Sequence, residues 1–184
     1  MAPSQPDIPI RGEFILAGPE TAEKGEKFVV PIVFRIRLDE FPSVPIEELK
    51  VEFHLVKRDG QELQAPFGAV LEPRDKVASR RAVRLHNGAA YFVADSPYIR
   101  YDGWFGIGAK IRRCRDSHEP AVVGRQVRNG MLRVERCLRD KPEPSNEDAH
   151  IMAELRAHGI LVDPTLSHAG TGRSQSESGC CVVL

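Results

Sequence analysis

Hydrophobic and polar residues alternate along much of the chain, with a period of two. The alternation is clearest over residues 30–38, 49–55 and 99–111, and it recurs in shorter stretches over 12–17, 89–94, 122–127 and 131–138. A period of two places every second side chain on one face, which is typical of β-strands with one buried and one exposed face. The pattern therefore predicts a chain built mainly from strands.

Turn-forming sequences separate several of these segments. Arg58-Asp59-Gly60-Gln61, His86-Asn87-Gly88 and Asn129-Gly130 each predict a hairpin turn. Many short strands with turns between them favour an antiparallel β-sandwich over an α/β fold. Three glycines, Gly103, Gly106 and Gly108, lie inside the 99–111 pattern, where they indicate a bulge or close packing between strands.

One helix is predicted near the end of the sandwich. Ser145 can cap its first turn, with Asp148 three residues later. Ile151, Met152 and Leu155 then form an apolar stripe, and Gly159 is a stop signal. We expect a flexible N-terminus over 1–9, one domain over 10–163 and a disordered Gly/Ser-rich tail over 164–184.

Composition and motifs argue against most enzyme classes. The 184 residues carry 26 basic and 26 acidic side chains, and no phosphate-binding loop or nucleophile elbow occurs. No histidine or cysteine spacing suits a metal, so neither a catalytic residue nor a metal or cofactor is predicted. An active site assembled from distant residues is the alternative. The four cysteines form no disulfide framework and no N-terminal signal is present, so we expect an intracellular protein.

The neutral total hides a basic middle segment. Residues 74–140 hold 15 basic and 7 acidic side chains, and 13 of the basic ones are arginine. Arginine suits phosphate and carboxylate groups, so the segment predicts an anion-binding surface. Its candidate residues are Arg74, Arg80, Arg81 and Arg84. The alternative is that these arginines point outward along strands and are only solvated.

The chain ends in Cys181-Val182-Val183-Leu184, a C-a-a-X pattern whose final leucine is associated with geranylgeranyl transfer. Cys181 is the candidate prenylation site. One lipid chain gives only marginal membrane binding, and the tail lacks a polybasic patch. Cys180 is therefore a candidate palmitoylation site, with a spare thiol as the alternative.

The order of the strand and helix motifs resembles the velvet domain of fungal regulators. The similar segments are 12–16 with Pro19-Glu20, 31–36, 90–93 leading into 99–105, 132–134, Pro144-Ser145 and 155–160. The resemblance implies a Rel-like β-sandwich that forms homo- or heterodimers with related domains. It also implies a nuclear protein that binds DNA and controls development and secondary metabolism.

The chain departs from the velvet pattern where the family contacts DNA. That segment is rich in Arg and Lys in the family, whereas here residues 20–27 contain three glutamates, and only Lys24 and Lys27 can carry over. Phosphate neutralisation dominates DNA affinity, so we expect weakened DNA binding. The competing hypothesis is a non-enzymatic interaction module that a lipidated C-terminus tethers to the cytosolic face of a membrane.

Overall fold

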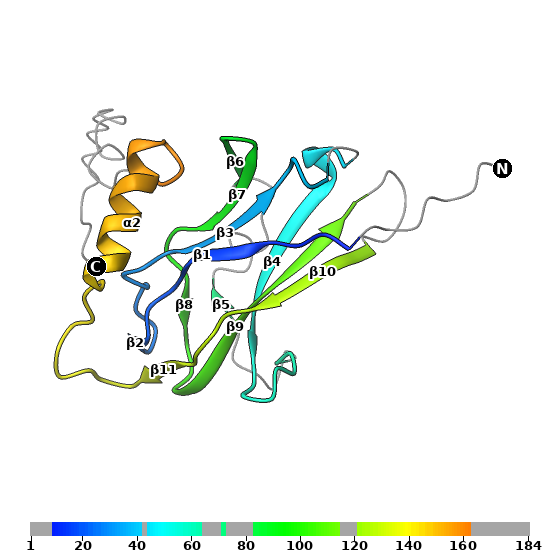
Figure 1. Ribbon diagram of the computed structural model, residues 1–184. Helices are drawn as coiled ribbons and strands as arrows, with labels where there is room; N and C mark the ends of the chain where they lie inside the picture. Colours follow the sequence, from blue (N-terminus) through cyan, green and yellow to red (C-terminus); the bar gives the residue numbers. More distant parts are fainter. Residues whose placement is uncertain (1–8, 42–43, 64–70, 73–82, 115–120, 163–184) are drawn as a thin grey trace, which may run out of the picture.

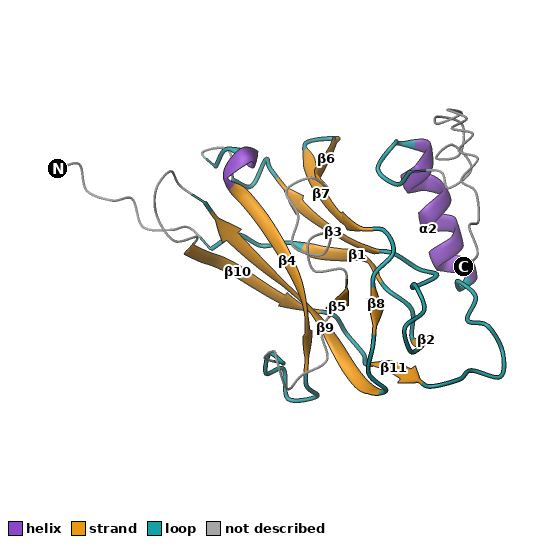
Figure 2. Ribbon diagram, turned by 180° about the vertical axis from the view of Figure 1, so that it is seen from behind, coloured by secondary structure: helices purple, strands orange, loops and turns teal. Residues whose placement is uncertain are grey.

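Two β-sheets pack face to face, and one helix covers the outside of the first sheet. In this computed structural model the described residues are 9–41, 44–63, 71–72, 83–114 and 121–162. The layers are visible from both sides (Figures 1 and 2). The fold is thus mainly β, a sandwich with one short helix, as the alternation predicts.

The first sheet has four antiparallel strands in the order β1-β3-β7-β6. These are β1 (Glu13–Ala17), β3 (Ile32–Arg37), β7 (Ala89–Ala94) and β6 (Val83–His86). β6 and β7 form the hairpin predicted at His86-Asn87-Gly88. Asn87 and Gly88 both have positive φ, 47° and 68°, as that tight turn requires.

The second sheet has five strands in the order β10-β9-β11-β2, with β4 on the other side of β9. Its strands are β4 (Leu49–Val56), β9 (Gly103–Arg113), β10 (Ala121–Val127), β11 (Leu132–Glu135) and β2 (Thr21–Glu23). β2 lies parallel to β11, so the sandwich is not entirely antiparallel. A short 3-10 turn, η1 (Ile46–Glu48), leads into β4.

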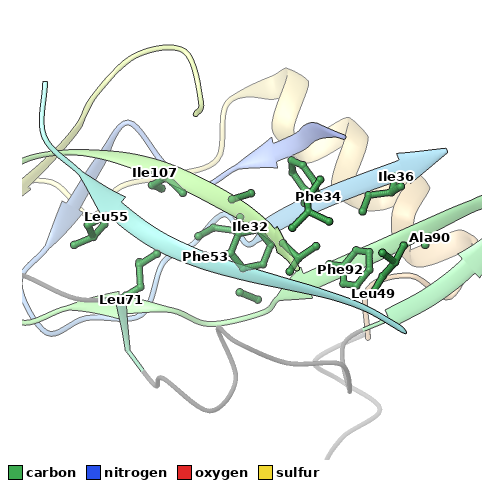
Figure 3. Packing of buried hydrophobic residues seen from close by; sticks show 14 of the residues in the cluster. Ile32, Phe34, Ile36, Leu49, Phe53, Leu55, Leu71, Ala90, Phe92 and Ile107 are labelled. Atoms are coloured by element: carbon green, nitrogen blue, oxygen red, sulfur yellow. The ribbon is translucent and has the colours of Figure 1, made fainter. Parts of the chain in front are cut away.

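The core lies between the two sheets. Phe34 of β3 and Phe53 of β4 face each other from opposite sheets, with ring centroids 6.5 Å apart, and Phe14 of β1 packs on Phe34 at 5.1 Å. Figure 3 shows the surrounding aliphatic side chains from both layers. The residues of β4 and β9 that alternate inward fill this layer, which is why their sequences have a period of two.

Helix α2 (Asn146–Ala157) begins and ends as predicted. The Ser145 hydroxyl accepts a hydrogen bond from the Asp148 amide at 3.0 Å. At the other end, Gly159 has a φ of 69°, and the amides of Gly159 and Ile160 donate to carbonyl oxygens of the last turn. Met152 and Leu155 are buried against β1, β3 and β7. For this reason β3 and β7 bury side chains on both faces, which simple alternation does not predict.

The single strand predicted over residues 99–111 is wrong in part. The pattern over 99–111 is not one strand, because β8 (Tyr98–Ile99) pairs with β5 (Leu71–Glu72) in a separate ladder. The backbone then bends at Arg100 and Tyr101, and β9 begins at Gly103, where φ is 145°.

The close packing predicted for the glycines of β9 is confirmed. A Cβ on Gly106 would lie 2.5 Å from Val56, and one on Gly108 would lie 2.6 Å from His54.

Asn129-Gly130 does not form a hairpin. β10 pairs with residues 108–113 of β9, and β11 pairs with residues 103–105 of the same strand. The two therefore follow one another along β9 instead of pairing together. Four residues, 128–131, lie opposite only two of β9, so the turn sequence forms an irregular bulge. By contrast, Arg58-Asp59-Gly60-Gln61 does reverse the chain, because Val56 bridges to Glu62.

Candidate interaction face of the five-stranded sheet

The outer face of the five-stranded sheet presents several charged side chains of β4 and β9 that form ion pairs. On β9, Phe105, Ile107, Ala109 and Ile111 point into the core, so Trp104, Lys110 and Arg112 project from the opposite face. β4 contributes Lys50, Glu52 and His54 to this face by the same alternation. One end of the face is charged and tightly paired, and the other end is aromatic.

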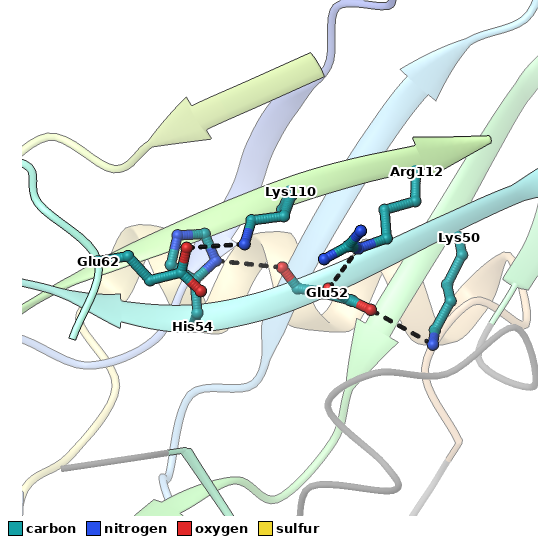
Figure 4. A network of polar contacts seen from close by, with 6 residues as sticks. All are labelled: Lys50, Glu52, His54, Glu62, Lys110 and Arg112. Atoms are coloured by element: carbon teal, nitrogen blue, oxygen red, sulfur yellow. Dashed lines mark hydrogen bonds and ion pairs between the residues drawn. The ribbon is translucent and has the colours of Figure 1, made fainter. Parts of the chain in front are cut away.

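At the charged end, acidic and basic side chains neutralise each other (Figure 4). Lys110 is the one buried charged residue of the described chain, and its Nζ donates to Glu62 Oε2 at 2.7 Å. Arg112 Nε donates to Glu52 Oε2 at 2.8 Å, and Lys50 Nζ lies 3.4 Å from the other oxygen of Glu52. Arg113, at the end of β9 on the side that faces the core, is paired with Glu48 of η1 at 2.7 Å.

Partial burial and ion pairing shift the pKa values of three groups in this network. Burial lowers the pKa of His54, and the neighbouring charge of Glu62 does not restore it. His54 Nδ1 lies 3.4 Å from the backbone oxygen of Glu52, where a neutral ring can donate. Burial alone would raise the pKa of Glu52 and Glu62, but hydrogen bonds from Arg112 and Lys110 lower both pKa values. The network is therefore a set of ion pairs around a neutral histidine.

At the other end, aromatic side chains are exposed. Trp104, the single tryptophan of the chain, is 62% exposed, and Tyr101 in the preceding turn is 52% exposed. Arg133 lies opposite Trp104 on β11, with its guanidinium carbon 5.6 Å from the indole centroid. We call Tyr101, Trp104 and Arg133 the aromatic surface. Charges of both signs surround it, because Asp102 pairs with Lys24 at 3.8 Å and with Arg136 at 3.5 Å.

The predicted anion-binding residues do not come together in the described chain. Lys24 is paired with Asp102, and Lys27 lines a groove of about 400 Å³ together with Glu23 and Glu26. Arg84 lies on β6, at the edge of the other sheet. Arg74, Arg80 and Arg81 are outside the described residues, as are Cys180 and Cys181 and the whole predicted tail.

Sequence reasoning missed the aromatic surface and one histidine contact. Trp104 and Arg133 become neighbours only through the register of β11 on β9, for which the sequence has no local signal. His86 and His158 are far apart in the sequence, yet their ring centroids lie 4.2 Å apart. They line a groove of about 430 Å³ between α2 and the first sheet.

No group of three or more metal-binding side chains occurs among the described residues. Within the same residues, no helix has the length and apolar character needed to cross a membrane.

Comparison with known proteins assigns no family to the chain. No family model and no curated protein matches the chain. Among solved structures, a chimeric titin Z1Z2 carrying an exogenous KLER peptide from decorin is 16% identical. The match covers 68% of this chain and 96% of that one, with a TM-score of 0.26. The assignment to the β-sandwich class therefore rests on the strand pairing described above.

Proposed function

We propose that this chain is a non-enzymatic regulatory β-sandwich that acts by pairing with a second copy of itself or with a related domain, as the velvet resemblance implies. The observation that supports this proposal is the exposure of the aromatic surface. Tryptophan, tyrosine and arginine are the residues most enriched where binding energy concentrates in protein interfaces. Here Trp104 and Arg133 face each other across neighbouring strands at one end of the sheet, and Tyr101 is exposed in the turn that precedes β9.

The charges around the aromatic surface suit a symmetric pair. In a twofold interface the same patch meets itself, so it must be complementary to itself. Asp102 and Glu135 lie beside Lys24, Arg133 and Arg136, and such a mixed patch can match acid with base across the axis. Two segments of the velvet resemblance, 99–105 and 132–134, also contribute the residues of this surface.

Self-association can be followed through the tryptophan itself. Sedimentation of the full chain over a concentration series should show a dimer, and the Trp104 emission should move to shorter wavelength as the dimer forms. Trp104→Ser should weaken the dimer at least about ten-fold, since a central aromatic anchor contributes about 2 kcal/mol or more. Leu85→Ser is the matched control, because Leu85 is 64% exposed on β6 of the other sheet.

A monomer at all concentrations would remove the self-association proposal, and a related domain would then be tested by mixing. Equal weakening by Trp104→Ser and Leu85→Ser would place the interface elsewhere.

The C-terminal motif supports a second function, a membrane-tethered interaction module. Its support is the sequence Cys181-Val182-Val183-Leu184 alone. The intact mass of the protein from its own host should show loss of the last three residues and gain of an isoprenoid. Cys181→Ser should move a tagged protein from membranes to the soluble fraction, whereas Cys137→Ser, at an exposed cysteine of the body, should not. An unmodified mass would end this proposal.

DNA binding remains a prediction of the velvet resemblance. Lys24 would have to leave Asp102 to contact a phosphate, and Lys27 has acidic neighbours. If the chain binds DNA, the affinity should fall steeply with salt. A gel shift at low salt with no retained DNA at micromolar protein would contradict it.

A further inference from the structure

Strand β2 is the last strand of the five-stranded sheet, and within the described residues it pairs on one side only. It runs parallel to β11, and the Arg133 amide donates to the carbonyl oxygen of Glu20 at 2.9 Å. Backbone groups point to alternate sides along a strand, so those of Ala22 also face β11. Those of Thr21 and Glu23 face the other way, toward the open side of the sheet.

Three backbone groups on this open side have no hydrogen-bond partner in the described chain. The Glu23 carbonyl oxygen accepts from the Glu26 amide at 3.1 Å, but within the same residues no bond is made by the Glu23 amide or by the amide and carbonyl of Thr21. Thr21 and Glu23 are both partly buried, and backbone polar groups are costly to leave unpaired away from water. An extended segment that lies beside β2 would pair with them, as peptides do at the open edges of other sheets.

A groove of about 400 Å³ lies beside this open edge, within the roughly 300–1,000 Å³ of ligand pockets. Thr21 and Glu23 line it together with Phe28, which is buried, and Val29, which is 38% exposed. Pro142, from the segment that connects β11 to α2, also lines the groove. The groove therefore combines an unpaired strand edge with apolar side chains, and an extended segment with apolar residues suits both.

The charges that line the groove are balanced. Glu23 and Glu26 are its acidic residues, and Lys27 and Lys141 are its basic ones. Neither lysine makes an ion pair within the described chain, so a carboxylate in the groove can pair with one of them. The glutamates oppose this attraction, and exposed ion pairs contribute little in any case. We therefore expect the backbone edge and the apolar side chains to supply most of the binding energy.

We propose that the unmodified C-terminal end of this chain, Cys181-Val182-Val183-Leu184, occupies the groove as an additional strand beside β2. Valine is enriched in strands, Leu184 adds an apolar side chain, and its carboxylate can pair with Lys27 or Lys141. Residues 163–184 span up to about 70 Å when extended, whereas a domain of this size has a radius of gyration of about 15 Å. The end can therefore reach the groove, and its attachment gives an effective concentration of about a millimolar.

Docking of this end would compete with prenylation. The aliphatic residues that would fill the groove are the same ones that a C-a-a-X transferase recognises, so one end cannot occupy both. This consequence rests on the second proposed function, whereas docking itself does not require that the motif is used. An unmodified mass from the host would end the prenylation proposal without affecting the docking proposal, which is tested on the purified, unmodified chain.

The test compares hydrogen exchange in the full chain and in a chain that ends at Gly179, both produced in a host that lacks a protein prenyltransferase and kept reduced. NMR measures the exchange rates of the Thr21 and Glu23 amide protons at low protein concentration. We expect both to exchange at least about ten-fold more slowly in the full chain, because each gains a hydrogen bond and exchanges only from the roughly 10% of molecules in which the end is not docked.

Two substitutions separate docking from an effect on folding. Val29→Asp puts a charge among the apolar side chains of the groove and should return both amide protons to the rates of the truncated chain. Leu184→Asp changes only the tail and should do the same. Val122→Asp is the matched control and should retain the slow exchange, because Val122 is 40% exposed on β10, which does not line the groove.

Equal exchange rates in the full and truncated chains would overturn the proposal, and so would equal effects of Val29→Asp and Val122→Asp. Slow exchange that depends on the protein concentration would show that the end of a second copy occupies the groove, which would overturn docking within one chain. Slow exchange that survives Leu184→Asp would overturn the proposal as well, because the apolar end would then not be the bound segment.

Discussion

Single glycines decide how closely the strands of this sandwich approach. Gly124 of β10 faces the backbone oxygen of Ile10, and an added Cβ would lie well inside contact distance of that oxygen. An added Cβ on Gly108 would instead meet the ring of His54, 2.6 Å from the nearest ring atom. A backbone carbonyl cannot rotate away, whereas a side-chain ring can.

Gly124→Ala should therefore destabilise the protein by about 1–3 kcal/mol, the usual cost of overpacking. Gly108→Ala should cost less, because the His54 ring can move; the stabilisation of about 0.4–1 kcal/mol from restricting the unfolded chain is common to both variants. Chemical denaturation of both variants measures the difference in the free energy of unfolding. Equal losses would mean that the two contacts are equally rigid.

His54 should make stability depend on pH. Burial lowers its pKa in the folded protein, whereas the unfolded chain keeps the ordinary pKa of about 6.5. The unfolded state then binds a proton more readily, so the free energy of unfolding should fall as the pH drops below about 6.5. The pKa values of Glu52 and Glu62 are lowered from 4.5, so these groups titrate below that window.

Chemical denaturation at pH 7.5 and at pH 5.5 measures how the free energy of unfolding depends on pH. His54→Gln should reduce the pH dependence, and His150→Gln, at an exposed position of α2, should leave it unchanged. An unaltered slope in His54→Gln would show that another group is responsible.

At the scale of elements, helix α2 depends on its caps as well as on its apolar stripe. The Ser145 hydroxyl accepts from the Asp148 amide and also donates to the Asp148 carboxylate at 2.8 Å. Ser145→Ala should lower the free energy of unfolding by about 1 kcal/mol, while Ser145→Asp, another preferred cap, should retain most of it. Thermal unfolding followed by circular dichroism measures both. If the two variants are equally destabilised, the hydroxyl does not act as a cap.

Elements with a strong local period could be predicted, and those without one could not. The alternation correctly predicts strands at β1, β3, β4 and β7, and the helix follows from its capping residues. β5 and β8 have only two residues each, too few to show a period. The bulge at Asn129-Gly130 was mistaken for a hairpin, because the same residue types suit both and the pairing with β9 decides between them.

The candidate sites depend even more on register. Charge counting indicated the basic segment 74–140, but Arg112 and Arg113 in it are paired with Glu52 and Glu48 from β4 and η1. The small pocket beside Gly106 is lined by residues 56–60 and 127–131, which lie far apart in the sequence. No local pattern could connect them before β4 and β10 were placed on opposite sides of β9.

At the scale of the whole molecule, the inter-sheet aromatic contacts hold the two layers together. Phe53 is buried and packs near both Phe14 and Phe34, at 6.4 Å and 6.5 Å between centroids. Phe53→Ala should cost about 3–5 kcal/mol, a large share of the stability of a domain of this size. Denaturant titration should show the loss with both sheets unfolding together. Separate transitions of near-ultraviolet and far-ultraviolet signals would mean that the sheets are not one cooperative unit.

Strand β9 is the central strand of the second sheet. β4 pairs along one side of it, and β10 followed by β11 pairs along the other. Its central amide protons are enclosed by backbone on both sides and can reach solvent only when neighbouring strands separate. We therefore expect the slowest hydrogen–deuterium exchange at residues 108–112, with opening energies close to that of global unfolding. The strand that presents Trp104 and Lys110 is then the part of the molecule that opens last.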